Sequence, residues 1–179
     1  MVLTEIQRTV LEAASSNLQV YDEEQWYNVA KMEVRFHFIA VLKEATPPFW
    51  LRAQVEFGFD AVDTAALIDS IYNEEGEEIE PEMELEIKVA VPTNETKTID
   101  MERLQEAVAG IIGQELPVIT HNERLAAHPT DKYKHEYAIE YFWRIGQDDF
   151  LNLEFYKDLF VGLERLLNYL KLERSEGER

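Results

Sequence analysis

The chain has 179 residues, of which 46% are hydrophobic and 30% are charged, and these values are typical of one globular domain with a sizeable core. Lys and Arg number 17 while Asp and Glu number 36, so the formal net charge is −19, which disfavours binding to nucleic acids and to anionic membrane surfaces. The chain has no cysteine, which excludes disulfides, thiolate nucleophiles and cysteine-based metal sites.

The N-terminal sequence MVLTEIQRTVLEAA does not contain the basic segment and the long apolar run of a secretory signal. No uncharged stretch of the chain is long enough to span a bilayer. We therefore expect a cytoplasmic protein that is not bound to a membrane.

The first third of the chain predicts one helix and two strands. Apolar residues recur at helical spacing over residues 4–18, and a short acidic connector follows them. Apolar and polar residues then alternate over 32–42 and again over 49–59, which predicts two half-buried strands. The Pro47-Pro48 turn between these strands favours their pairing as an antiparallel hairpin.

The middle of the chain predicts two more helices around a third strand. Asp60 is expected to cap a helix that runs to about Tyr72, and an acidic loop follows it. A strand with a clear alternation occupies 83–91. Asp100 is expected to cap the next helix, which ends before Pro117.

The last third ends in the clearest helix of the chain. Residues 118–132 show little pattern, although a short strand over 118–120 is compatible with them. Alternation returns in an aromatic-rich strand over 133–145. A continuous apolar stripe then predicts a helix over 149–173.

These elements have the order α-β-β-α-β-α-(β)-β-α. Because strands that alternate are typical of antiparallel sheets with one covered face, we expect an α+β fold with a mainly antiparallel sheet of four to five strands and with helices packed on one face. A single domain over 1–173 and a polar C-terminal tail over 174–179 are expected. The buried face of the sheet is predicted to contain Phe36, Phe38, Leu51, Val55, Leu85, Ile87, Ile139 and Tyr141.

No residue pattern indicates a catalytic, cofactor or metal site. His121, His128 and His135 recur every seven residues, but Pro129 interrupts any helix that could align them, and a strand would place residues seven apart on opposite faces. Acidic and basic residues alternate with the apolar residues of the strands, which indicates cross-strand ion pairs on a solvated sheet face. We therefore expect no metal ligands, no catalytic residues and no cofactor.

Glutamate is concentrated between Glu74 and Glu86, and the order of the residues is not that of a calcium-binding loop. A solvated hairpin-like loop is the simplest interpretation of this run, and the docking of a basic partner is the alternative.

Seven residues are candidates for an interface with another protein. Trp50 and Phe142 lie on the polar sides of their strands, where exposed aromatic residues often serve as anchors. The last helix carries a coiled-coil-like seam that predicts a homodimer, with the protein's own core as the alternative: Tyr156, Phe160, Leu163, Leu167 and Leu170. Gly162 lies within this helix, where close approach of another backbone would explain it.

In size, charge and the alternation of helices with strands the chain is similar to the small, acidic, cysteine-free α+β chaperones that escort secreted effectors. The predicted function is therefore a non-enzymatic, acidic protein-binding module, adaptor or chaperone-like, whose partner is a protein. The negative charge of the chain favours a basic partner. Two alternatives stay open. One is a small-molecule-binding protein or enzyme with a pocket between sheet and helices, and the other is a polyanion mimic that inhibits a nucleic-acid-binding partner.

Overall fold

A computed structural model describes residues 2–14, 17–45, 51–93, 100–113, 116–123 and 135–177. The elements follow one another as α1 (Val2–Ala13), β1 (Leu18–Asn28), β2 (Glu33–Leu42), β3 (Arg52–Phe59), α2 (Ala61–Ile68), β4 (Glu82–Thr93), α3 (Met101–Val108), β5 (Val118–Glu123), β6 (His135–Gly146), a short 3-10 helix (Gln147–Asp149) and α4 (Leu153–Gly177). None of the helices in this part of the chain combines the length and the apolar character that crossing a membrane requires.

The strands form one antiparallel sheet in the order β1-β2-β3-β4-β6-β5. The α+β class and the antiparallel pairing are therefore confirmed. The predicted four to five strands are corrected to six in the described residues, because the segment read as a connector is strand β1. The helix predicted over 4–18 ends at Ala13, which leaves Leu18 free to begin that strand.

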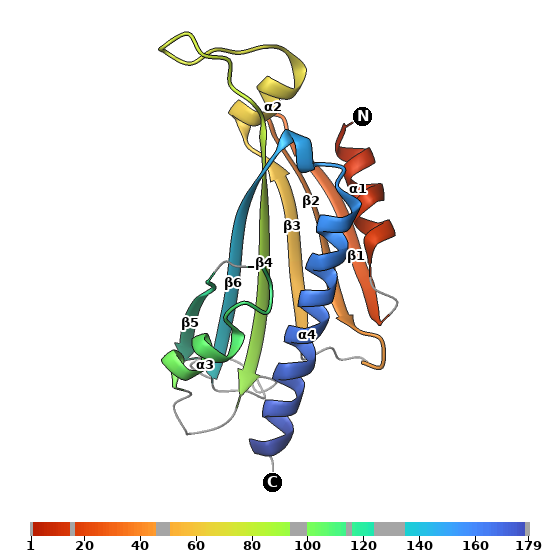
Figure 1. Ribbon diagram of the computed structural model, residues 1–179, viewed down its shortest axis with the longest axis vertical. Coiled ribbons are helices and arrows are strands. Elements are labelled where there is room, and N and C mark those ends of the chain that lie inside the picture. Colours follow the sequence, from red (N-terminus) through yellow and green to blue (C-terminus); the bar gives the residue numbers. More distant parts are fainter. Residues whose placement is uncertain are drawn as a thin grey trace.

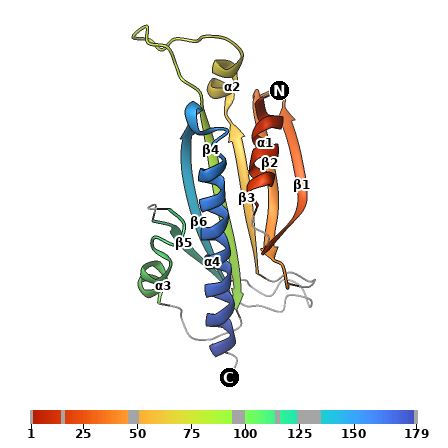
Figure 2. The ribbon, with the colours of Figure 1, turned by 45° about the vertical axis from the view of Figure 1, so that its right-hand side comes forward.

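Three helices lie against the same face of the sheet, which we call the inner face (Figures 1 and 2). Helix α4 runs along β2 and β3, α1 packs beside α4, and α3 lies near β5 and β6. Helix α2 lies at the end of β3, and its N-terminus is capped as predicted, because Asp60 accepts hydrogen bonds from the backbone N–H groups of Val62 and Asp63. The prediction that helices pack on one face is confirmed.

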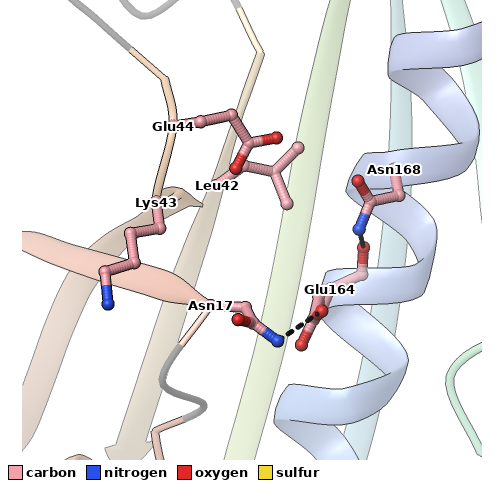
Figure 3. A pocket seen from close by; sticks show the side chains of 6 residues that line it. All are labelled: Asn17, Leu42, Lys43, Glu44, Glu164 and Asn168. Carbon is pink, nitrogen blue, oxygen red and sulfur yellow. Dashed lines mark hydrogen bonds between the residues drawn. The ribbon is translucent and has the colours of Figure 1, made fainter.

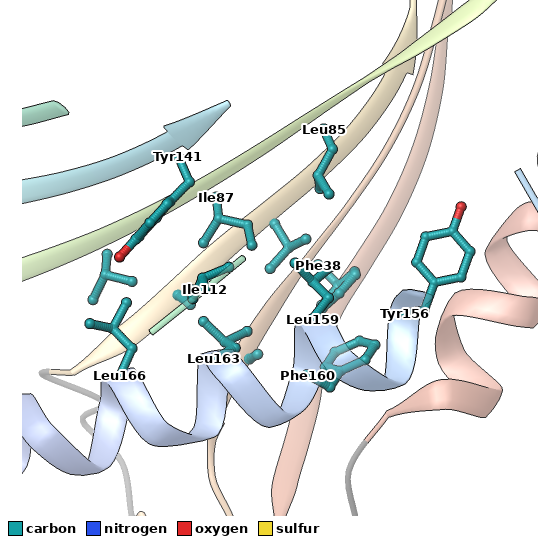
Figure 4. Packing of buried hydrophobic residues seen from close by; sticks show 14 of the residues in the cluster. Phe38, Leu85, Ile87, Ile112, Tyr141, Tyr156, Leu159, Phe160, Leu163 and Leu166 are labelled. Atoms are coloured by element: carbon teal, nitrogen blue, oxygen red, sulfur yellow. The ribbon is translucent and has the colours of Figure 1, made fainter. Parts of the chain in front are cut away.

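The inner face and the helices enclose one hydrophobic core (Figure 4). The eight residues predicted for the buried face of the sheet are all buried. Phe38 illustrates the packing: its ring lies 5.6–6.3 Å from those of Phe36, Phe57 and Phe160, so residues of β2, β3 and α4 meet at one point. These separations are those of favourable aromatic pairs.

Helix α4 differs from its predicted bounds at both ends. It begins at Leu153, after the 3-10 helix, and it continues to Gly177. Residues 174–177 of the predicted polar tail are therefore helical, and the last two residues lie outside the described part of the chain. Helix α3 is shorter than expected, because Gly110 follows it with a φ of +72°, a left-handed conformation in which a helix stops.

Candidate functional site

The face of the sheet opposite the helices carries most of the polar side chains of the strands. We call it the open face, because none of the described helices packs on it. Strand register places twelve of its residues side by side: Glu24, Trp26, Arg35, His37, Gln54, Glu56, Glu84, Glu86, Lys88, Glu140, Phe142 and Arg144.

Ion pairs connect neighbouring strands across the middle of the open face. Arg35 forms ion pairs with Glu56 and Glu84 at 3.1 Å each, which confirms the predicted cross-strand ion pairing. Arg144 reaches the same Glu84 at 3.6 Å, so this carboxylate lies between two guanidinium groups. The hydrogen bond from Lys88 to Glu140 raises the pKa of Lys88. These pairs fix the charged side chains of β2, β3, β4 and β6 relative to one another.

Two carboxylates of the open face have no such partner. Glu24 and Glu86 make no ion pair with any residue that the structure describes. They belong to one cross-strand row, in which His37 and Glu56 lie between them and Phe142 follows Glu86. The row therefore presents two carboxylates that make no ion pair in the described chain, one of them next to an aromatic ring.

Trp26 reaches the open face because of a β-bulge. Between Tyr21 and Glu24 the register of β1 against β2 shifts by one residue. Before the bulge Leu18 points inward opposite Leu42, whereas after it Trp26 points outward opposite Arg35. A bulge that redirects a side chain in this way is a common feature of functional surfaces.

A depression of about 290 Å³ lies beside the indole of Trp26. Its other lining residues come from the row described above and from its neighbours: Glu24, His37, Gln54, Val55, Glu56, Glu86 and Lys88. Carboxylates around an indole are groups that attract a lysine or arginine side chain of another protein.

A second depression, of about 450 Å³, lies at the other side of the open face. Phe142 is 53% exposed there, as predicted for a residue on the polar side of its strand. Leu116 and Val118 lie next to it and are 64% and 62% exposed. The carboxylates of Glu86 and Glu140 also line this depression. An apolar group with a basic neighbour would be complementary to it.

The third depression, of about 380 Å³, lies between the β1–β2 end of the sheet and α4 (Figure 3). Asn17 donates a hydrogen bond to Glu164 at 3.0 Å there. At its rim Lys171 donates to Glu44, which lowers the pKa of Glu44. Its lining contains no histidine or tyrosine, and Asn17 and Asn168 both donate hydrogen bonds to Glu164. The hydrogen bonds of Asn17 and Lys171 attach α4 to the β1–β2 end of the sheet, so they have a structural role.

The histidines are arranged differently from the prediction. His121 lies in β5 and His135 in β6, and the register of these two strands brings both side chains to the same face of the sheet. Nε2 of His121 is 3.1 Å from Nδ1 of His135. The ring of His121 also stacks on Tyr137. His128 lies outside the described residues. Within the described part of the chain, no three His, Asp or Glu side chains form a group that could hold a metal ion.

Two buried tyrosines do not join this histidine pair. Tyr141 donates a hydrogen bond to the carbonyl oxygen of Val108 at 3.2 Å, and burial raises the pKa of Tyr141 to about 12. Tyr156 donates to the carbonyl oxygen of Phe150 at 2.9 Å, and burial raises its pKa as well. Both hydroxyls satisfy backbone groups in the core, and neither points at a reactive centre.

The residues predicted for a dimer interface are placed inside the chain. The five seam residues of α4 are at most 4% exposed and pack under the sheet: Tyr156, Phe160, Leu163, Leu167 and Leu170. The close approach predicted at Gly162 exists, but its partner is the backbone of Ile111 and Ile112 in the same chain. Trp50 lies outside the described residues. Of the predicted interface residues, Phe142 is therefore the one that the structure places on an exposed surface.

Comparisons of the chain with protein-family models, with curated proteins and with solved structures gave no match. The residues of the open face and the chemistry they offer are thus the basis for a functional proposal.

Proposed function

We propose that this protein is a non-enzymatic binding module, an adaptor or chaperone-like protein, that holds a protein partner against the open face of its sheet. The observation that carries the proposal is the placement of Trp26 and Phe142, two exposed aromatic residues at opposite sides of an acidic surface. Four strand-to-strand steps separate them, or roughly 19 Å, a span that one protein partner covers.

The chemistry of the open face favours a partner that is basic at its contact surface. Large aromatic side chains are frequent anchors of protein interfaces, because they bury much apolar area with few rotatable bonds. Glu24 lies beside Trp26 on β1, Glu86 lies opposite Phe142 on the neighbouring strand β4, and neither makes an ion pair within the described chain. A net charge of −19 also accelerates the encounter with a basic protein.

The two alternative functions find less support in the geometry. An enzyme site needs polar groups that converge on one point. His121 and His135 contact each other, but the Tyr141 hydroxyl is bonded to the backbone of Val108 and does not join them. A mimic of a nucleic acid needs a continuous array of negative charges, whereas Arg35, Lys88 and Arg144 interrupt the acids of the open face.

The test is affinity capture with the intact protein and two matched variants. The first variant, Trp26→Ala with Phe142→Ala, removes both aromatic residues of the open face. The second, Tyr72→Ala with Leu151→Ala, removes two large apolar side chains that are at least as exposed and lie outside the sheet strands. Circular dichroism would show that both variants keep the fold.

We expect a basic protein to be retained by the wild type and by the Tyr72/Leu151 variant and to be lost from the Trp26/Phe142 variant. Its association rate should fall as ionic strength rises. The proposal fails if the captured proteins are the same for all three forms. Native mass spectrometry adds a second readout, because a small molecule bound in stoichiometric amount would favour the ligand-binding alternative.

A further inference from the structure

The two edges of the sheet are protected to different extents. An edge strand presents unpaired backbone N–H and C=O groups, and proteins usually protect such edges with charges, prolines or bulges. Strand β1 has two of these features, namely the bulge between Tyr21 and Glu24 and three successive acidic residues over 22–24. It is therefore a poor template for another strand.

Strand β5, at the opposite edge, has none of these features before its last residue. It pairs with β6 in continuous register from Val118 to Glu123, without a bulge. Residues 118–122 carry no formal charge and include no proline. Val118, Thr120, His121 and Asn122 are all exposed, and within the described residues no further strand pairs with the other side of β5. An edge of this kind is a template for strand addition.

An apolar depression adjoins the start of this edge. Strand β5 begins at Val118, opposite Glu140, so it stops short of the position facing Phe142. A strand that ran beside β5 and past its start would bring a side chain to the depression that Leu116, Val118 and Phe142 line. Glu86, which makes no ion pair in the described chain, and Glu140, which is bonded to Lys88, line the same depression. Basic side chains of the added strand would meet this acidic lining.

We infer that the edge of β5 that no described strand covers binds an extended segment of a basic partner protein, in which apolar residues alternate with Lys or Arg. The inference rests on the proposed protein-binding function and names the form in which the partner is held. The backbone of the segment extends the sheet, an apolar side chain occupies the depression at Phe142, and the basic side chains contact Glu86 or Glu140. A second copy of this chain is the poorer occupant, because both copies carry a net charge of −19.

The experiment uses the full chain and synthetic peptides of about seven residues, a usual strand length. One peptide alternates lysine with valine, and a second alternates glutamate with valine. Two further forms of the lysine peptide carry N-methyl groups, one on every lysine and the other on every valine. An added edge strand donates hydrogen bonds to its neighbour from alternate residues, so only one of the two methylated forms should lose binding.

The expected result is binding of the lysine peptide, with amide shifts in NMR spectra centred on residues 118–122. One methylated form and the glutamate peptide should each bind about tenfold more weakly, and the other methylated form should stay within about threefold. Val118→Arg should weaken the lysine peptide about tenfold, while Val62→Arg, the same change at an exposed valine of α2, should leave it unchanged.

Equal binding by both methylated forms, shifts centred on β1, or no binding by any peptide would each overturn strand addition at β5. A dimer held through β5 would also overturn it, because the occupant would then be a second copy.

Trp26→Ala separates the two proposals. If the open-face proposal alone fails, the variant captures every natural partner yet the peptide still binds at β5. If strand addition alone fails, the open-face variants lose their partner and the peptide does not bind.

Discussion

A methyl group placed on Gly162 would lie 2.7 Å from the carbonyl oxygen of Ile111, a distance that real side chains do not adopt. Helix α4 therefore passes the segment after α3 at a separation that glycine alone permits. In an open helix, replacing glycine by alanine would stabilise the protein by about 1 kcal/mol. Here the nearest atoms belong to backbone, which cannot rotate away.

We expect Gly162→Ala to lower the free energy of unfolding by about 1–3 kcal/mol, in spite of the better helix propensity of alanine. Urea denaturation of the intact chain measures this change. Val161→Ala, at the neighbouring exposed position of the same helix, is the control and should change stability much less. A stabilised Gly162→Ala variant would show that α4 does not approach Ile111 so closely.

Phe38→Ala tests the centre of the core. The Phe38 side chain is fully buried between β3 and α4, so its removal leaves a cavity and should cost about 3–5 kcal/mol in denaturant unfolding. Phe142→Ala, in the same sheet but on the open face, is the control and should cost far less. A loss below about 1 kcal/mol for Phe38→Ala would contradict its placement in the core.

Glu84 and Glu86 form a matched pair for the ion network of the open face. The two residues point the same way from β4, but Glu84 contacts Arg35 and Arg144 whereas Glu86 makes no ion pair within the described chain. Glu84→Gln should therefore destabilise the protein by about 1–2 kcal/mol. Glu86→Gln should be neutral or slightly stabilising, since it removes one unpaired charge. Equal effects in urea denaturation would show that the network does not contribute to stability.

Much of the fold could be predicted from the sequence because β2, β3, β4 and β6 alternate without interruption. Strand β1 could not, because the bulge after Tyr21 reverses which residues point inward and breaks the period of two. The same bulge hid the position of Trp26, which lies in the segment read as a connector. Nothing in the sequence marks the bulge, apart from the polar residues around it.

The candidate site was predictable only in part. Phe142 could be placed on an exposed face, because one continuous strand fixes its orientation. The partner of the α4 stripe could not, because Ile111 and Gly162 are distant in sequence and an apolar stripe looks the same whether it packs within a chain or between chains. The pairing of His121 with His135 likewise depends on the register of two strands.

Asp63 should make stability depend on pH. The residue is buried at the start of α2, its carboxylate accepts a hydrogen bond from the N–H of Glu82 at 2.9 Å, and burial raises the pKa of Asp63 above 3.8. A raised pKa means that the folded state binds the proton more tightly, so this group reduces stability as pH rises from 3.8 through the folded-state pKa.

Asp63→Asn removes that dependence while it keeps an oxygen that can accept from Glu82. The free energy of unfolding of the wild type, relative to the variant, should therefore increase as pH is lowered from about 7 to about 4. Asp69→Asn, at an exposed position after the same helix, controls for the loss of one negative charge. A difference that is independent of pH would mean that Asp63 is not buried as a charged group.

Salt should stabilise the folded state. Like charges repel one another more strongly in the compact protein than in the unfolded chain, and at a net charge of −19 this repulsion should exceed what salt takes from the ion pairs. The melting temperature by calorimetry should be higher in about 0.5 M than in about 0.02 M NaCl. A flat or falling trend would show that the ion pairs of the open face dominate instead.

The position of α4 along the chain affects how the protein is made. The apolar residues of β2 are synthesised early, but the helix that covers them begins at Leu153, more than 100 residues later. At roughly 5–20 residues per second, a ribosome leaves this surface uncovered for on the order of ten seconds. During that time the nascent sheet is a substrate for chaperones that bind apolar segments, and a ribosome stalled before Leu153 would leave a product that cannot bury its own core.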